Sequence, residues 1–99
     1  MYNYSMEYEW DERKRRANIA KHGVDFYVAE TFVWNTAIDV EDDRKNYGES
    51  RRVALGLVDS RLFVLIYTRR SRVCRIISLR KANDRERRYY ENEAKTGPH

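Results

Sequence analysis

The sequence is poor in several features that define common protein classes. Its 99 residues include one cysteine, one proline and four glycines. The lone Cys74 cannot form an internal disulfide or a zinc cluster, which excludes a disulfide scaffold and a zinc finger and fits a reducing cytoplasm. No run approaches the ~18 apolar residues of a membrane span, and Met1–Trp10 lacks the apolar core of a secretory signal. The sequence also lacks a G-x-G-x-x-G loop, which excludes a dinucleotide-binding domain of that type. From the single cysteine and the lack of a membrane span or secretory signal, we expect a cytoplasmic protein without membrane contact.

What is present indicates one small folded domain. Apolar residues make up 41% of the chain and charged residues 36%. The aromatic content of 13% argues against disorder, because disordered segments contain few aromatic side chains. A chain of this length has room for one hydrophobic core. We therefore expect a single domain over residues 1–95, followed by a frayed tail over residues 96–99.

Positive charge is concentrated near the C-terminus. The whole chain carries a net charge of +4, but residues 69–90 alone hold nine lysines and arginines against two acidic residues, a balance of +7. Such a segment is typical of a protein that binds a polyanion. Its arginines flank an apolar strand and open a helix, which favours a nucleic-acid partner. The alternative is a solvated, arginine-rich surface without a ligand.

The first third of the chain predicts a strand and two helices. Met6–Trp10 alternates polar and apolar residues, as a strand does. Asp11 is suited to cap a helix over residues 12–22, and Gly23 can take the left-handed conformation that ends it. Apolar spacings of three and four after Asp25 predict a second short helix from Phe26 to about Val33.

The remainder predicts strands and a final helix. We expect a short strand over Ala37–Val40 and a polar loop over residues 41–50. Three apolar, β-branched runs separated by turns predict a meander, and Asn83 with Glu86 resembles a capping box for a helix from Asp84 to about Ala94. The three runs are Arg52–Val58, Leu62–Thr68 and Val73–Leu79. The fold class is α+β, an antiparallel meander with helices packed on it, in the order β-α-α-β-β-β-β-α.

Four short strings together resemble the BrnT family of small toxins from bacterial type II toxin–antitoxin pairs. They are Tyr8-Glu9-Trp10-Asp11, Lys21-His22-Gly23-Val24-Asp25-Phe26, Arg75-Ile76-Ile77-Ser78-Leu79-Arg80-Lys81-Ala82 and Glu86-Arg87-Arg88-Tyr89-Tyr90. The resemblance covers about residues 6–91. It implies a RelE-like fold and a ribonuclease that cleaves RNA and inhibits translation. It also implies a ribbon-helix-helix antitoxin of the BrnA type as partner, with operator DNA bound only through the toxin–antitoxin complex, which represses its own operon.

RNA cleavage without a metal uses the ribose 2′-oxygen as nucleophile. It needs a base near that hydroxyl, cations around the phosphorane and an acid for the leaving 5′-oxygen. The sequence has no dense set of carboxylates and histidines, so we expect a metal-independent route and no cofactor. Asp42 and Asp43 could hold Mg²⁺. A solvated acidic loop is the favoured reading of that pair.

Four residues are the catalytic candidates. Arg80 offers a planar fork for phosphate, and Ser78 shares its face in an extended strand. Arg75 then faces the other way, unless a bulge intervenes. His22 is suited to proton transfer near neutral pH, but it could simply cap its helix. Glu86 could act as a base, although its capping-box spacing favours a structural role.

Further residues are candidates for RNA and phosphate binding. These are Lys21, Arg69, Arg72, Arg75, Lys81, Arg87 and Tyr90. Tyr90 could stack on a base, although a tyrosine at helical spacing is more often a core residue. Two other functions stay open: a non-catalytic RNA- or DNA-binding module, and an interaction protein whose charges serve only a partner protein.

Overall fold

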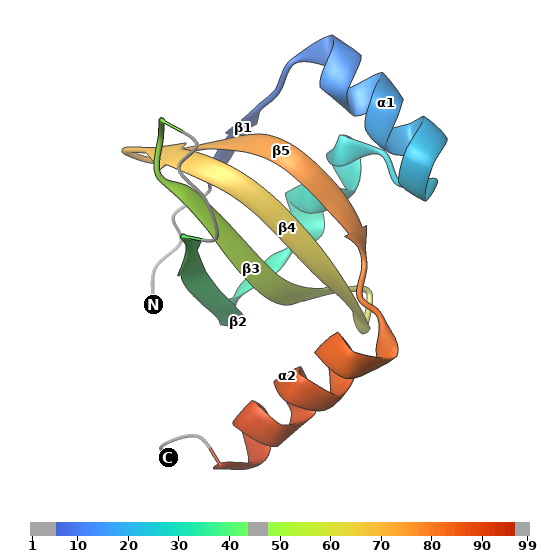
Figure 1. Cartoon of the computed structure of the whole chain (residues 1–99), viewed down its shortest axis with the longest axis vertical. Coiled ribbons are helices and arrows are strands. Elements are labelled where there is room, and N and C mark those ends of the chain that lie inside the picture. Colours follow the sequence, from blue (N-terminus) through green and yellow to red (C-terminus); the bar gives the residue numbers. More distant parts are fainter. Residues whose placement is uncertain (1–5, 44–47, 97–99) are drawn as a thin grey trace.

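The computed structural model describes residues 6–43 and 48–96. Five strands form one sheet in the order β1-β5-β4-β3-β2 (Figure 1). The strands are β1 Glu7–Glu9, β2 Val33–Asp42, β3 Arg51–Val58, β4 Arg61–Arg70 and β5 Val73–Lys81. The helices are α1 Glu12–His22, the short 3-10 helix η1 Phe26–Thr31 and α2 Asp84–Thr96. The α+β class and the order of elements are confirmed, although part of the predicted loop, residues 44–47, and the end of the predicted tail, residues 97–99, lie outside the described residues.

The prediction of a purely antiparallel sheet is wrong at one edge. Strands β2 to β5 form the expected antiparallel meander, but β1 pairs with β5 in parallel, with Tyr8 opposite Cys74. The sheet is therefore mixed. A period of two identifies a strand but carries no information about its partner or direction. The free edge of β5 was available for pairing, and β1 fills part of it.

The second helix is shorter and tighter than predicted. It is a 3-10 helix that ends at Thr31, and Val33 and Trp34 belong to β2 instead. Phe32 is extended and buried, and Val33 pairs with Leu57 of β3. A β-branched residue next to an aromatic one fits a half-buried strand better than a helix, which accounts for the early start of β2.

Strand β4 lies in the middle of the sheet and is buried on both faces, as predicted. On one face a cluster that includes Phe26 and Phe32 of the η1 region packs on Leu65 and Tyr67. The opposite face carries a smaller cluster, which includes Val64 and the partly buried Tyr90 of α2. Figure 1 shows α2 leading away from the end of β5. The second face is therefore covered more sparsely than the first.

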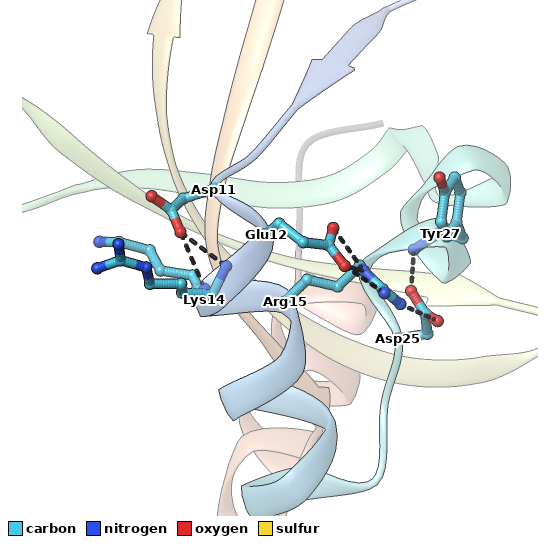
Figure 2. Close-up of polar contacts among 7 residues, drawn as sticks. Asp11, Glu12, Lys14, Arg15, Asp25 and Tyr27 are labelled. Carbon is cyan, nitrogen blue, oxygen red and sulfur yellow. Dashed lines mark hydrogen bonds and ion pairs between the residues drawn. The ribbon is translucent and has the colours of Figure 1, made fainter.

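The ends of α1 follow the sequence signals. Asp11 accepts hydrogen bonds from the backbone N–H groups of Arg13 and Lys14, and the chain turns at Gly23, which has φ +71°. Figure 2 shows Arg15 reaching from α1 to Asp25, the cap of η1, with an Nη1 to Oδ2 distance of 2.9 Å. This ion pair links α1 to the start of η1.

Replacing Gly23 with valine should lower the free energy of unfolding by about 1 kcal/mol or more. Apart from the two neighbouring residues of the chain, no atom lies within 4 Å of the position that a Cβ atom would take, so we expect the loss to come from the left-handed backbone. Thermal unfolding of the variant measures it. An unchanged melting temperature would contradict this account of the junction.

Within residues 6–43 and 48–96, none of the helices is both long and apolar enough to cross a membrane.

Candidate active site

A bulge in β5 decides which side chains can meet. Ile66 of β4 lies opposite Ser78, but the next residue, Tyr67, lies opposite Ile76, so Ile77 is an extra residue. An extra residue reverses the alternation of faces beyond it. Arg75 therefore lies on the same face as Ser78 and Arg80, while Cys74, Ile76 and Leu79 are buried against the opposite face. The expectation that Arg75 faces away from Arg80 held for a regular strand only, and the bulge that it named as the exception is present.

Arg80 is held by Glu86 in a two-pronged ion pair. Its Nη1 and Nη2 atoms lie 2.9 Å and 2.8 Å from Oε1 and Oε2 of the carboxylate. Glu86 also accepts a hydrogen bond from the backbone N–H of Asn83, whose side chain accepts one from the N–H of Glu86, so the predicted capping box is present. The hydrogen bonds from Arg80 lower the pKa of Glu86 below its usual value. An ionised carboxylate in this position orients Arg80 and is poorly suited to accept a proton.

Asn18 fastens α1 to the outer edge of β5. Its side-chain N–H₂ donates to the carbonyl of Leu79 at 2.7 Å and to that of Val24 at 2.9 Å, and its oxygen accepts the N–H of Leu79 at 3.2 Å. The side chain is buried, with 6% exposed. The Asn18 side chain therefore makes the same two hydrogen bonds to the backbone of Leu79 that a neighbouring strand could make. Leu79 lies beyond residues 73–75, the part of β5 that pairs with β1. Sequence reasoning missed Asn18, for which the only signal is a weak helix former between an alanine and an isoleucine.

The contact between α1 and β5 frames a hollow of about 250 Å³. Lys21 and His22 line it from the last turn of α1, and Ser78 lines it from β5. The structure therefore brings these three predicted residues together. Lys14 adds a further cation from α1.

The surroundings of His22 favour the neutral imidazole. Desolvation lowers its pKa below the ordinary value, and the positive charges of Lys21 and Arg80 lower it further. The end of a helix normally favours a charged histidine. With its pKa below the ordinary value, His22 is largely neutral and able to accept a proton at neutral pH.

Three of the predicted RNA-binding arginines lie away from this hollow. Arg69 lies opposite Cys74, hence on the other face, and Arg72 lies in the turn before β5, roughly 25 Å from Arg80 at ~3.3 Å per residue. Arg75 shares the face of Arg80, but its Nη1 atom lies 3.1 Å from a carboxylate oxygen of Glu9. These arginines do not join the cluster around Ser78.

The other three predicted contacts lie on or near α2. Lys81 and Arg87 line a separate hollow. Tyr90 packs against the smaller apolar cluster, and its hydroxyl donates to the carbonyl of Thr36 at 3.0 Å. This contact favours the packing role for Tyr90 over base stacking.

The acidic pair of the β2 end lies closer to Arg80 than the sequence indicates. Asp42 and Asp43 line a hollow of about 330 Å³ together with Arg80 and Glu86. Among residues 6–43 and 48–96, no three histidine, cysteine, aspartate or glutamate side chains are grouped so that they could hold a metal ion.

Comparison with protein families matches residues 10–86 to the model described as "Ribonuclease toxin, BrnT, of type II toxin-antitoxin system". The match spans 77 of 99 residues, counted from 10 to 86, and includes α1, the whole sheet from β2 to β5 and the start of α2. No curated protein matches the chain. The hollow residues Lys21, His22 and Ser78 and the ion pair of Arg80 with Glu86 all fall inside the matched range. The chain belongs to the BrnT family, the ribonuclease toxins of type II toxin–antitoxin systems.

Proposed function

We propose that this chain is a metal-independent endoribonuclease that cuts RNA beside β5 and thereby inhibits translation. The observation that carries the proposal is the meeting of Lys21 and His22 with Ser78 at one hollow, next to Arg80. Together these side chains offer a base, a hydroxyl donor and two cations. That set fits cleavage by the ribose 2′-oxygen.

The reaction can be assigned to these residues step by step. Neutral His22 takes the proton of the 2′-hydroxyl as the 2′-oxygen attacks phosphorus. The bond from phosphorus to the 5′-oxygen breaks, and the leaving oxygen takes a proton from water, which leaves a 2′,3′-cyclic phosphate and a 5′-hydroxyl. Arg80, oriented by Glu86, and Lys21 stabilise the charge on the phosphorane oxygens, and Ser78 donates a hydrogen bond to one of them.

The pH profile should show the lowered pKa of His22. A base acts only when unprotonated, so cleavage should rise with pH, and the midpoint of the rise should lie below about 6.5, the ordinary pKa of histidine. Initial rates between pH 4.5 and 8 measure the profile. His22→Ala should lose the acidic limb, whereas His99→Ala, which changes the only other histidine, should keep it. An identical profile in the His22 variant would contradict its role as base.

RNA affinity should fall steeply with salt. The motive is the +7 balance over residues 69–90. Each phosphate that is neutralised releases a counterion, so three contacts would weaken binding by about tenfold or more between roughly 50 and 200 mM salt. Titration of a single-stranded RNA at several salt concentrations gives the slope. A flat response would refute a basic binding face.

The proposal extends to the partners. An antitoxin of the ribbon-helix-helix, BrnA-like type would cover the basic face and block phosphate binding, and the complex would bind operator DNA and repress its own operon. Acidic groups or a docked helix would meet the cations. A RelE-like origin of the fold and action in the cytoplasm belong to the same proposal.

One observation favours a second function, a non-catalytic RNA- or DNA-binding module. Both outer nitrogens of Arg80 contact Glu86, whereas Arg61, Lys81 and Arg87 are exposed, so cations away from the proposed reaction site are the more accessible to a nucleic acid. Inducible expression in bacteria separates the two functions. A ribonuclease should arrest growth and fragment cellular RNA soon after induction. Salt-sensitive RNA binding with intact RNA would favour the second function.

A further inference from the structure

A second basic hollow opens at the end of the sheet, where the β3–β4 turn meets the start of α2. Its volume is about 640 Å³, and its cations come from three elements: Arg61 of β4, Lys81 of β5 and Arg87 of α2. The Arg87 guanidinium is held in place by the carbonyl of Ala82 at 2.9 Å and by the carboxylate of Asp84. All three cations are exposed, so a ligand in the hollow could reach them.

The other residues that line this hollow are two apolar residues and the two residues of the β3–β4 turn. Leu62 and Ala82 line it and are buried, with 5% and 6% exposed. Asp59 and Ser60, the two turn residues, also line it, and both have positive φ, +50° and +67°. A two-residue hairpin turn of this kind favours asparagine and glycine. Aspartate is also among the residues that adopt positive φ, and the turn places the Asp59 carboxylate and the Ser60 hydroxyl at the hollow.

We propose that this hollow is a nucleotide subsite, which holds the RNA residue next to the bond that is cleaved. The cations would take its phosphate, the apolar floor would take the face of its ribose or base, and the Asp59 carboxylate would accept a hydrogen bond from a base amino group. A bare anion fits less well, because the same carboxylate would repel it. The side chains of Lys81 and Arg80 lie on opposite faces of β5, and the backbone links the two sites: Nη1 of Arg80 donates to the carbonyl of Lys81 at 3.3 Å.

The subsite rests on the proposed function, but binding tests it separately. The probe is a short, single-stranded RNA of mixed sequence with 2′-O-methyl groups, which cannot be cleaved by 2′-oxygen attack. We expect Arg61→Ala to weaken its binding by about tenfold, the effect of one charge-assisted hydrogen bond. The matched control is Arg88→Ala, which removes the same charge from α2 one residue beyond Arg87 and should change affinity less than twofold. Equal losses in the two variants would overturn the subsite, because only net charge would then matter.

Two further variants of the turn address specificity. Asp59→Asn should change which nucleotide is preferred beside the cut, measured by mapping cleavage sites across a mixed RNA. Ser60→Gly should raise the melting temperature and weaken RNA binding, since it relieves the backbone and removes a hydroxyl. Unchanged cleavage sites in the first and unchanged affinity in the second would both count against the subsite.

The outcomes separate this inference from the proposed function. The probe could bind more weakly to the Arg61 variant than to the Arg88 variant while none of the three proteins cleaves unmodified RNA. That result would support the subsite and overturn the proposed ribonuclease activity. If the parent chain cleaves RNA and both variants lose equal affinity for the probe, the ribonuclease activity is supported and the subsite is overturned.

Discussion

Arg80→Ala should lower the rate of RNA cleavage by about 10²- to 10³-fold, the usual effect of removing one preorganised donor. The phosphorane spreads negative charge over its equatorial oxygens, and Arg80 is fixed beside it by Glu86 at 2.8 and 2.9 Å. The fold should survive. The pair is partly exposed, and such pairs typically contribute about 1 kcal/mol or less. Single-turnover rates, together with thermal unfolding, measure both effects.

Arg80→Lys is the informative companion variant. Lysine keeps the charge but offers one ammonium on a flexible stem in place of a planar fork, so it should restore little activity. Glu86→Gln should reduce the rate less than Arg80→Ala, because glutamine can still accept one hydrogen bond from the guanidinium. Cleavage by Arg80→Ala at the parental rate would contradict the assignment of Arg80 as the residue that binds the phosphate.

Asn18→Leu should lower the free energy of unfolding by about 3 kcal/mol. Leucine has a similar size but can neither donate nor accept, so three backbone groups would be left without their partner: the carbonyls of Val24 and Leu79 and the N–H of Leu79. An unsatisfied buried polar group costs about 1 kcal/mol or more. Denaturant unfolding measures the loss.

The same variant should reduce cleavage in the molecules that remain folded. Asn18 fastens the helix that carries His22 to the strand that carries Ser78, so its loss lets the two sides of the hollow separate. The control is Asn35→Leu, the same substitution at an exposed position of β2, which should change stability by less than about 0.5 kcal/mol. A loss below 1 kcal/mol in the Asn18 variant would contradict the clamp.

Local signals predicted the elements well. Asp11 and Gly23 predicted the two ends of α1 as the structure has them. The spacing of Asn83 and Glu86 predicted the start of α2, where the structure shows their reciprocal hydrogen bonds. These signals succeed because a helix end is satisfied by residues within a few positions of it.

Features that depend on distant partners were not predictable in the same way. The parallel pairing of β1 with β5 joins residues 66 positions apart, and the register slip at Ile77 depends on β4 as much as on β5. The slip moved Arg75 to the face of Arg80, and the clamp of Asn18 on Leu79 spans 61 positions. The candidate residues of the site could thus be chosen from the sequence, but which of them meet could not.

The most direct test is to incubate the purified chain with single-stranded RNA in EDTA and to analyse the new ends. The account predicts fragments that carry a 2′,3′-cyclic phosphate and a 5′-hydroxyl, because the attacking oxygen belongs to the ribose. The Arg80→Ala protein, prepared in parallel, should yield few or none. Intact RNA in EDTA, with cleavage restored by a divalent cation and 5′-phosphate ends, would contradict the account.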